Sequence, residues 1–132
     1  MTEYPDLRLY IGGAWRITTA SQPVLNPSSE AIIGQVPIAT RPDLDDALDA
    51  ARGGFKVWSG FSPRKRAEIM LKAAALMRER SDEIARAITL EHGKPFNQAR
   101  LEIIRGCEFF EWDVAEGQRQ EPGASMQGAS EA

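Results

Sequence analysis

The sequence predicts an α+β chain, in which two short β-hairpins within residues 1–40 are followed by four helices within residues 41–119. Three observations support this class. Apolar runs broken by turn signals occupy residues 7–36, which is typical of short strands. From residue 40 onward the apolar residues recur every three or four positions, which is typical of helices. Residues 120–132 are small, polar and without a period, so they are expected to form a disordered tail.

Two turn signals define the hairpins. Gly12-Gly13 lies between two apolar runs, and this two-residue turn requires positive φ angles that glycine adopts readily. The run Asn26-Pro27-Ser28-Ser29 separates the second pair of strands and consists of residues that favour turns. Isolated hairpins are marginally stable in water, so we expect both to pack on another part of the chain.

Capping residues locate the helices. Thr40, Ser62 and Ser81 are the N-cap candidates of the first three helices, and Pro95 begins the fourth. The apolar residues of the first helix form one continuous stripe. They are Leu44, Ala47, Leu48, Ala51, Phe55 and Trp58. The fourth helix has apolar residues on more than one face, which predicts that it is buried from two sides.

Composition excludes several classes of protein. A net charge of -3 without a clustered basic face argues against nucleic acid as a partner. No apolar run approaches about 18 residues, so no membrane span is expected. The single cysteine excludes an internal disulfide and suits a reducing compartment, and the first residues do not resemble a signal peptide. A cytoplasmic location is therefore expected.

The pair Gly93-Lys94 suggests a phosphate-binding loop, but its neighbours do not fit one. That motif needs a glycine where Ile88 stands and a serine or threonine where Pro95 stands. The better interpretation is a helix break, with Gly93 ending one helix and Pro95 starting the next. His92, the only histidine, lacks the further ligands that a zinc site needs, so it is expected at a helix end.

Cys107 and the carboxylates near it do not form a catalytic set. Cys107 lies in the middle of a predicted helix on an apolar row, so it is expected in the core instead of acting as a nucleophile. Glu108 and Glu111 could be an acid and base pair, but carboxylates at this spacing are more often solvated or paired with a basic neighbour such as Arg105. From the residues alone, no catalytic or cofactor-binding residue is assigned.

Several short motifs, in their order and spacing, resemble a known family. They are Tyr10-Ile11-x-Gly13, Asn26-Pro27, Gly34-x-Val36-Pro37, Ala50-Ala51 with Phe55 and Trp58, Arg66, and Leu90-Glu91-x-Gly93-Lys94-Pro95. Together, from Leu9 to Arg119, the chain resembles the N-terminal segment of the NAD(P)-dependent aldehyde dehydrogenases. Among these it looks most similar to the bacterial succinate-semialdehyde dehydrogenases.

This resemblance implies the first part of the α/β Rossmann-like fold of that family. It also implies oxidation of an aldehyde to an acid with NAD or NADP, through attack by a cysteine thiolate. The family's nucleophile, general base and cofactor motifs come later than the matched segment, and Cys107 does not match the nucleophile's context. We therefore expect a truncated chain that is inactive alone and binds neither NAD nor NADP by itself.

Some residue roles follow from the resemblance only. The fourth helix borders the substrate entrance in the family, so Phe109, Phe110 and Trp112 are candidates for lining it. Some members hold a monovalent cation, for which the matching positions are the carbonyl of Leu25 and the carboxylate of Glu91. The implied partners are an aldehyde and, through exposed apolar surface, another copy of the chain or a full-length relative.

Two alternatives remain open at this point. The first is a non-catalytic helical interaction module that derives from the same family and binds a relative through its exposed apolar surface. The second is an unrelated helical protein, which requires that no strands form in residues 7–36.

Overall fold

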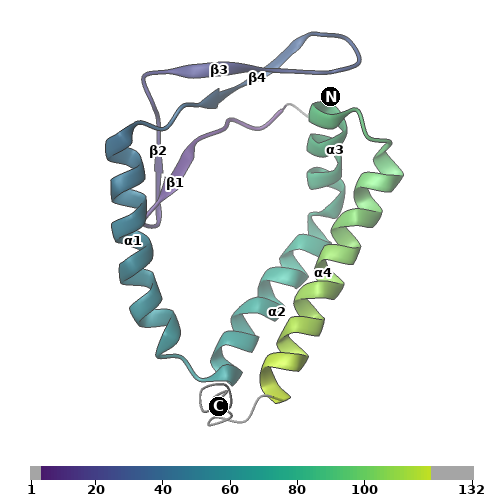
Figure 1. The fold of residues 1–132 in the computed structure, drawn as a ribbon. Helices are drawn as coiled ribbons and strands as arrows, with labels where there is room; N and C mark the ends of the chain where they lie inside the picture. The colour runs from purple at the N-terminus through teal and green to yellow at the C-terminus, as the bar shows by residue number, and fades with distance from the viewer. Residues whose placement is uncertain (1–3, 120–132) are drawn as a thin grey trace, which may run out of the picture.

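The computed structural model describes residues 4–119 and has the predicted α+β class. Two antiparallel hairpins precede four helices (Figure 1). The strands are β1 (Leu9–Ile11), β2 (Ala14–Arg16), β3 (Ser21–Leu25) and β4 (Ile32–Pro37). The helices are α1 (Arg41–Ser59), α2 (Pro63–Glu79), α3 (Ser81–His92) and α4 (Phe96–Arg119). The strands contradict the alternative of a wholly helical protein, and the predicted tail lies outside the described residues.

Both predicted turns form. Gly12 and Gly13 have φ angles of 61° and 85°, which allow the tight reversal between β1 and β2. Across this hairpin Tyr10 pairs with Trp15, and the two ring centroids lie 4.7 Å apart. In the turn between β3 and β4, the amide of Ser28 donates to Oδ1 of Asn26 over 2.9 Å. The hairpins are separate two-stranded sheets.

The capping predictions are confirmed for two helices and wrong for the third. Thr40 and Asp43 form a reciprocal capping box at the start of α1. Ser62 accepts from the amide of Lys65 over 3.2 Å at the start of α2. Ser81 does not cap α3, because only one residue, Arg80, separates α2 from α3 and occupies the N-cap position. Ser81 is instead the first residue of α3 and is buried.

The break between α3 and α4 has the predicted glycine. Gly93 follows α3 with a φ angle of 70°, the left-handed conformation that commonly ends a helix. Pro95 lies one residue before α4 instead of within it, and its carbonyl accepts from the amides of Gln98 and Ala99.

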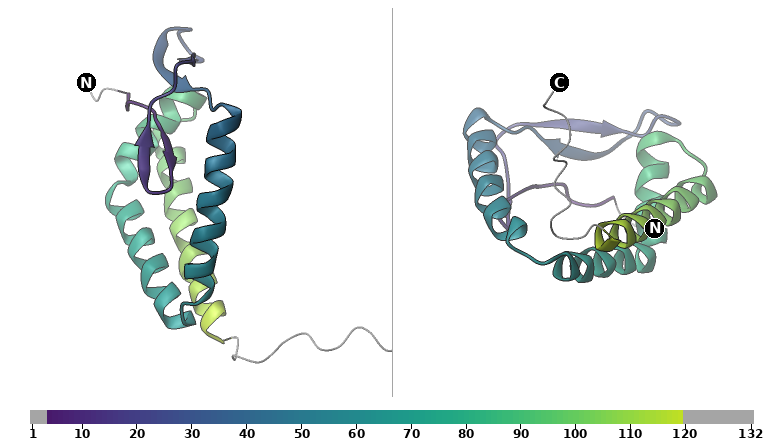
Figure 2. Two further views of the ribbon diagram at one scale, coloured as in Figure 1. Left: turned by 90° about the vertical axis from the view of Figure 1, so that its left-hand side faces the viewer. Right: turned by 60° about the horizontal axis from the view of Figure 1, so that its bottom comes forward.

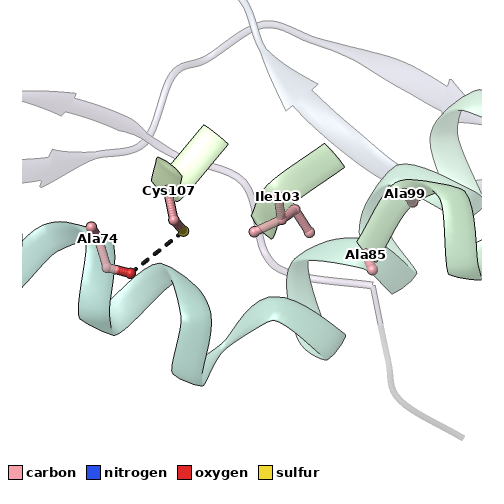
Figure 3. Close-up of a cluster of buried hydrophobic side chains, with 5 residues drawn as sticks. All are labelled: Ala74, Ala85, Ala99, Ile103 and Cys107. Atoms are coloured by element: carbon pink, nitrogen blue, oxygen red, sulfur yellow. Dashed lines mark hydrogen bonds between the residues drawn. The ribbon is translucent and has the colours of Figure 1, made fainter. Parts of the chain in front are cut away.

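The core lies where α2, α3 and α4 meet. Its buried cluster consists of Ala74, Ala85, Ala99, Ile103 and Cys107 (Figure 3). Cys107 is fully buried, and its thiol lies 3.5 Å from the carbonyl oxygen of Ala74, to which it donates. The small alanines let the helices approach closely. The expectation that Cys107 belongs to the core is confirmed.

The fourth helix is buried on one face only. Ile103 and Cys107 face the core, whereas Phe109 and Trp112 remain 69% and 63% exposed. One of the two apolar faces of α4 therefore has no partner among the described residues. Nothing in residues 4–119 covers the second face of α4.

The first helix stands apart from the other three (Figures 1 and 2). It packs mainly against β1, and none of its residues, all of which are described, is buried. Arg16 of β2 makes an ion pair with Asp46 over 2.6 Å, which attaches the first hairpin to this helix. Among the described residues, no helix combines the length and apolar character that crossing a membrane requires.

Candidate functional site

The turn after α3 is a meeting point of three chain segments. A Cβ built on Gly93 would lie 3.3 Å from Cγ of Pro27, so the turn of the second hairpin packs against the end of α3. Tyr4 reaches the same region, where its hydroxyl donates to Oε1 of Glu91. Its ring lies against Gly34 of β4 so closely that any Cβ at that position would overlap with it.

These contacts place the two cation candidates in neighbouring segments. Leu25 ends β3 just before Pro27, and Glu91 lies in the last turn of α3 just before Gly93. The carboxylate of Glu91 is engaged by Tyr4, a contact that the sequence did not reveal because the two residues lie 87 positions apart in the chain. The described residues contain no group of three or more histidine, cysteine or acidic side chains that could hold a metal ion.

The environment of Tyr4 shifts its ionisation. Burial, the hydrogen bond to Glu91 and the negative charge of Glu91 together raise the pKa of Tyr4 from 10.0 to about 12. Because the folded-state pKa lies above the ordinary value, the stabilisation is complete below pH 10 and is lost as the pH rises towards 12.

We expect Gly34→Ala to displace the Tyr4 ring and to lower its pKa towards the ordinary value. The measurement is a spectroscopic titration of tyrosinate in a Tyr10→Phe background, which leaves Tyr4 as the only tyrosine. Gly117→Ala is the matched control, because a Cβ there meets no atom within 4 Å. Equal titration midpoints for Gly34→Ala and Gly117→Ala would contradict the contact between Tyr4 and Gly34.

The exposed face of α4 contains a second candidate site. Arg105, Phe109 and Trp112 follow one another at helical spacing and line an open groove of about 560 Å³. Glu108 and Asp113 complete its lining. Two aromatic rings beside one guanidinium suit a ligand that combines a short apolar part with an anionic group.

The structure separates the three candidate entrance residues. Phe109 and Trp112 line the groove together, but Phe110 is half-buried and packs against the core cluster. The sequence did not predict Arg105 as a site residue. Its spacing of four residues from Phe109 and seven from Trp112 nevertheless indicates that the three share one face of the helix.

Glu111 of α4 and Lys94 of the turn before it make ion pairs that link parts of the fold. Glu111 pairs with Arg78 of α2 at 2.7 Å and 2.8 Å instead of with Arg105. Lys94 donates to both carboxylate oxygens of Glu102, and this hydrogen bond and charge lower the pKa of Glu102. Lys94 therefore ties the turn to α4, which agrees with the exclusion of a phosphate-binding loop.

The described residues do not fit a dinucleotide cofactor. Such a site needs a parallel strand that leads through a glycine-rich turn into a helix. Residues 4–119 contain only antiparallel hairpins, and the Gly93-Lys94 turn joins two helices. No part of the cofactor chemistry is assigned to these residues.

Comparison with known proteins identifies the family. The model of the aldehyde dehydrogenase family matches residues 15–131. The chain belongs to this family, as the sequence motifs predicted.

Several matched relatives are bacterial semialdehyde dehydrogenases. Malonate-semialdehyde dehydrogenase 2 of Bacillus cereus is 41% identical over 105 residues, which are 78% of this chain and 22% of the relative. Malonate-semialdehyde dehydrogenase 1 of Geobacillus thermodenitrificans is 43% identical over 113 residues, 84% of this chain and 23% of the relative. These names do not support the more specific resemblance to succinate-semialdehyde dehydrogenases.

Solved structures confirm the fold. An NADP-dependent enzyme of E. coli superposes with a TM-score of 0.82 at 33% identity, over 86% of this chain and 24% of its own. An aldehyde dehydrogenase of Brucella melitensis biovar abortus 2308 gives 0.80 at 30% identity, over 83% and 23%. The chain thus spans about a quarter of the length of these enzymes and has the fold of their matching part.

Proposed function

We propose that this chain forms the N-terminal part of an NAD(P)-dependent dehydrogenase that oxidises a short semialdehyde to the corresponding dicarboxylate. The supporting observation is its 41% identity to a malonate-semialdehyde dehydrogenase over 105 residues. Malonate semialdehyde is the favoured substrate, and succinate semialdehyde, which is one carbon longer, is the second. In the reaction the aldehyde and water yield the acid, and a hydride passes to the nicotinamide ring.

The groove on α4 supports this class of substrate. A semialdehyde has a carboxylate at the end opposite the aldehyde, and an arginine pairs with a carboxylate through two parallel hydrogen bonds. Among the described residues that line the groove, Arg105 alone is cationic. We assign to Arg105 the binding of the substrate carboxylate, and to Phe109 and Trp112 the apolar walls of the groove. Glu108 and Asp113 repel an anion elsewhere in the groove and so favour this one orientation.

The chain on its own is proposed to be inactive. Cys107 is its only cysteine, is fully buried, and donates its thiol to the carbonyl of Ala74. A nucleophile must reach the aldehyde carbon, so Cys107 cannot make this attack while α2 and α4 remain packed. The nucleophile and the cofactor site must be supplied by other residues.

A chimera tests this proposal. Residues 9–119 replace the matching segment of the Geobacillus relative, and NADH formation is followed with malonate semialdehyde, succinate semialdehyde and uncharged propanal. We expect turnover of the semialdehydes by the chimera and none by the isolated chain. An unstable or inactive chimera that lacks the parent's turnover would contradict the proposed equivalence of the two segments.

Arg105→Gln in this chimera tests the assigned residue. Loss of a hydrogen-bonded charge pair costs about 1.5–3 kcal/mol, so we expect kcat/KM for the semialdehydes to fall about ten- to a hundredfold. The value for propanal should stay unchanged, because it has no carboxylate. Arg64→Gln is the matched control, since that side chain is 88% exposed on α2. An equal loss for propanal would show that Arg105 is structural.

A second candidate is a non-catalytic interaction module derived from the same family. The observation that favours it is α1, a helix with an apolar stripe and no buried residue. Binding of the isolated chain to a full-length relative, without turnover, would support this candidate. Two further predictions hold under either candidate. The first is a monovalent-cation site formed by the carbonyl of Leu25 and the carboxylate of Glu91, and the second is a cytoplasmic location.

A further inference from the structure

Arg105 of the α4 groove lies between two carboxylates on its own helix. Glu102 comes three residues before it and Glu108 three residues after it, a spacing at which helical side chains are neighbours. Arg105 nevertheless makes no ion pair with either of them, nor with any other carboxylate of residues 4–119. Its guanidinium is therefore open to a carboxylate from outside the chain.

Lys94 engages the first of these carboxylates. Its Nζ atom lies 2.7 Å and 2.6 Å from the two carboxylate oxygens of Glu102. Only Pro95 separates Lys94 from the start of α4, so the lysine approaches Glu102 from the turn before the helix. The hydrogen bond and the charge of Lys94 are the main causes that lower the pKa of Glu102, and the charge of Arg105 is a smaller one. Arg105 is thus close enough to act on Glu102 but is not its partner.

The second carboxylate also lies near another cation. Arg78 of α2 donates to both carboxylate oxygens of Glu111 over 2.7 Å and 2.8 Å. This hydrogen bond is the main cause that raises the pKa of Arg78, and the negative charge of Glu108 raises it further. Glu108 is therefore stabilised by Arg78 across the contact between α2 and α4. Each carboxylate beside Arg105 thus interacts with a different cation.

We propose that Lys94 is a positioning residue that keeps Arg105 available to the substrate by holding the carboxylate of Glu102. This role rests on the proposed function, in which Arg105 binds the carboxylate of a semialdehyde. Lys94 does not touch the substrate in this arrangement, but it determines which cation Glu102 pairs with. The Gly93-Lys94 pair, which does not form a phosphate-binding loop, thereby contributes to substrate binding through an ion pair.

Without Lys94, the carboxylate of Glu102 is expected to pair with Arg105. Arg100, the other arginine in this part of α4, is already held by Asp82 over 2.7 Å. The side chain of Glu102 is 57% exposed, and ion pairs with this exposure are weak. The new pair therefore lowers the apparent affinity for a substrate carboxylate about two- to fivefold and does not abolish binding.

Steady-state kinetics of the chimera test the effect on the substrate. In Lys94→Met we expect KM for malonate semialdehyde to rise about two- to fivefold with kcat unchanged, and both constants for propanal to stay the same. The double variant Lys94→Met/Glu102→Gln removes the competing carboxylate and should restore KM. Lys65→Met is the matched control, because it breaks a similar ion pair with Glu68 on α2. A fall in kcat for both substrates, or no recovery in the double variant, would overturn the proposal.

NMR of the chain itself tests the exchange of partners without any substrate. The Nε–H signal of Arg105, assigned with Arg105→Gln, should shift in Lys94→Met and return in the double variant, whereas Lys65→Met should leave it unchanged. A rise in KM without this shift would show that Lys94 acts only through its charge, which overturns the proposal. The shift without a change in KM would confirm the exchange of partners and contradict the binding of substrate by Arg105. Failure of the inference and failure of the proposed function are therefore distinguishable.

Discussion

Replacing Ile103 with alanine is expected to lower the free energy of unfolding by about 2–5 kcal/mol, measured by denaturant titration. Ile103 is 6% exposed and is the largest side chain of the buried cluster (Figure 3). Its fully buried neighbours are three alanines and Cys107, and larger half-buried side chains such as Met77 and Phe110 pack around this cluster. The loss therefore combines the missing apolar contacts with the cost of the space that these side chains do not fill.

Leu101→Ala is the matched control for this prediction. Leu101 lies two residues away on the same helix and is 50% exposed, so its loss should cost well under half as much. Both variants remove a branched side chain of the same size from α4. Similar destabilisation by the two variants would show that the helix itself, and not the packing of Ile103, determines the loss.

The second large effect is expected at the turn between α3 and α4. Gly93→Ala should destabilise the chain by about 1–2 kcal/mol, since a residue with a Cβ is strained at positive φ. The φ angle of Gly93 is 70°, and the added Cβ would also press on Pro27 at 3.3 Å. Thermal or denaturant unfolding monitored by helix content measures this loss.

Gly53→Ala makes the same chemical change with the opposite expected sign. Gly53 lies within α1, where an added Cβ meets no atom within 4 Å, and alanine favours a helix by about 0.5–1 kcal/mol over glycine. This variant should therefore stabilise the chain. A gain for Gly93→Ala, or a loss for Gly53→Ala, would contradict the backbone conformations described here.

The sequence predicted those features that depend on neighbouring residues. The Gly12-Gly13 turn, the caps at Thr40 and Ser62, and the glycine after α3 all follow from local conformational preferences. The cap at Ser81 failed because α2 and α3 are almost continuous, and close packing of the helices decides where that side chain lies.

Contacts between distant segments could not be predicted in the same way. Helical period indicates that α4 has two apolar faces, but it does not tell which face meets α2. Phe109 and Phe110 are adjacent in sequence and have opposite surroundings for this reason. The contact of Tyr4 with Glu91 and Gly34 depends on how the chain folds back, and no local pattern encodes it.

The family could be predicted from the sequence, whereas the branch of the family and the substrate could not. The order of short motifs was sufficient to identify the aldehyde dehydrogenase family. It was insufficient to choose the branch, because the motifs lie in the hairpins, the turns and the first three helices, and none of them lines the groove on α4. The substrate is expected to depend on individual side chains such as Arg105, whose place in the groove became evident only from the structure.

The burial of Cys107 has a practical consequence. The thiol is the only one in the chain, and it lies between α2 and α4 with its hydrogen on the carbonyl of Ala74. A thiol reagent can reach it only after the two helices separate. The rate at which the reagent labels the unmodified chain therefore reports how often its core opens, without any engineered cysteine.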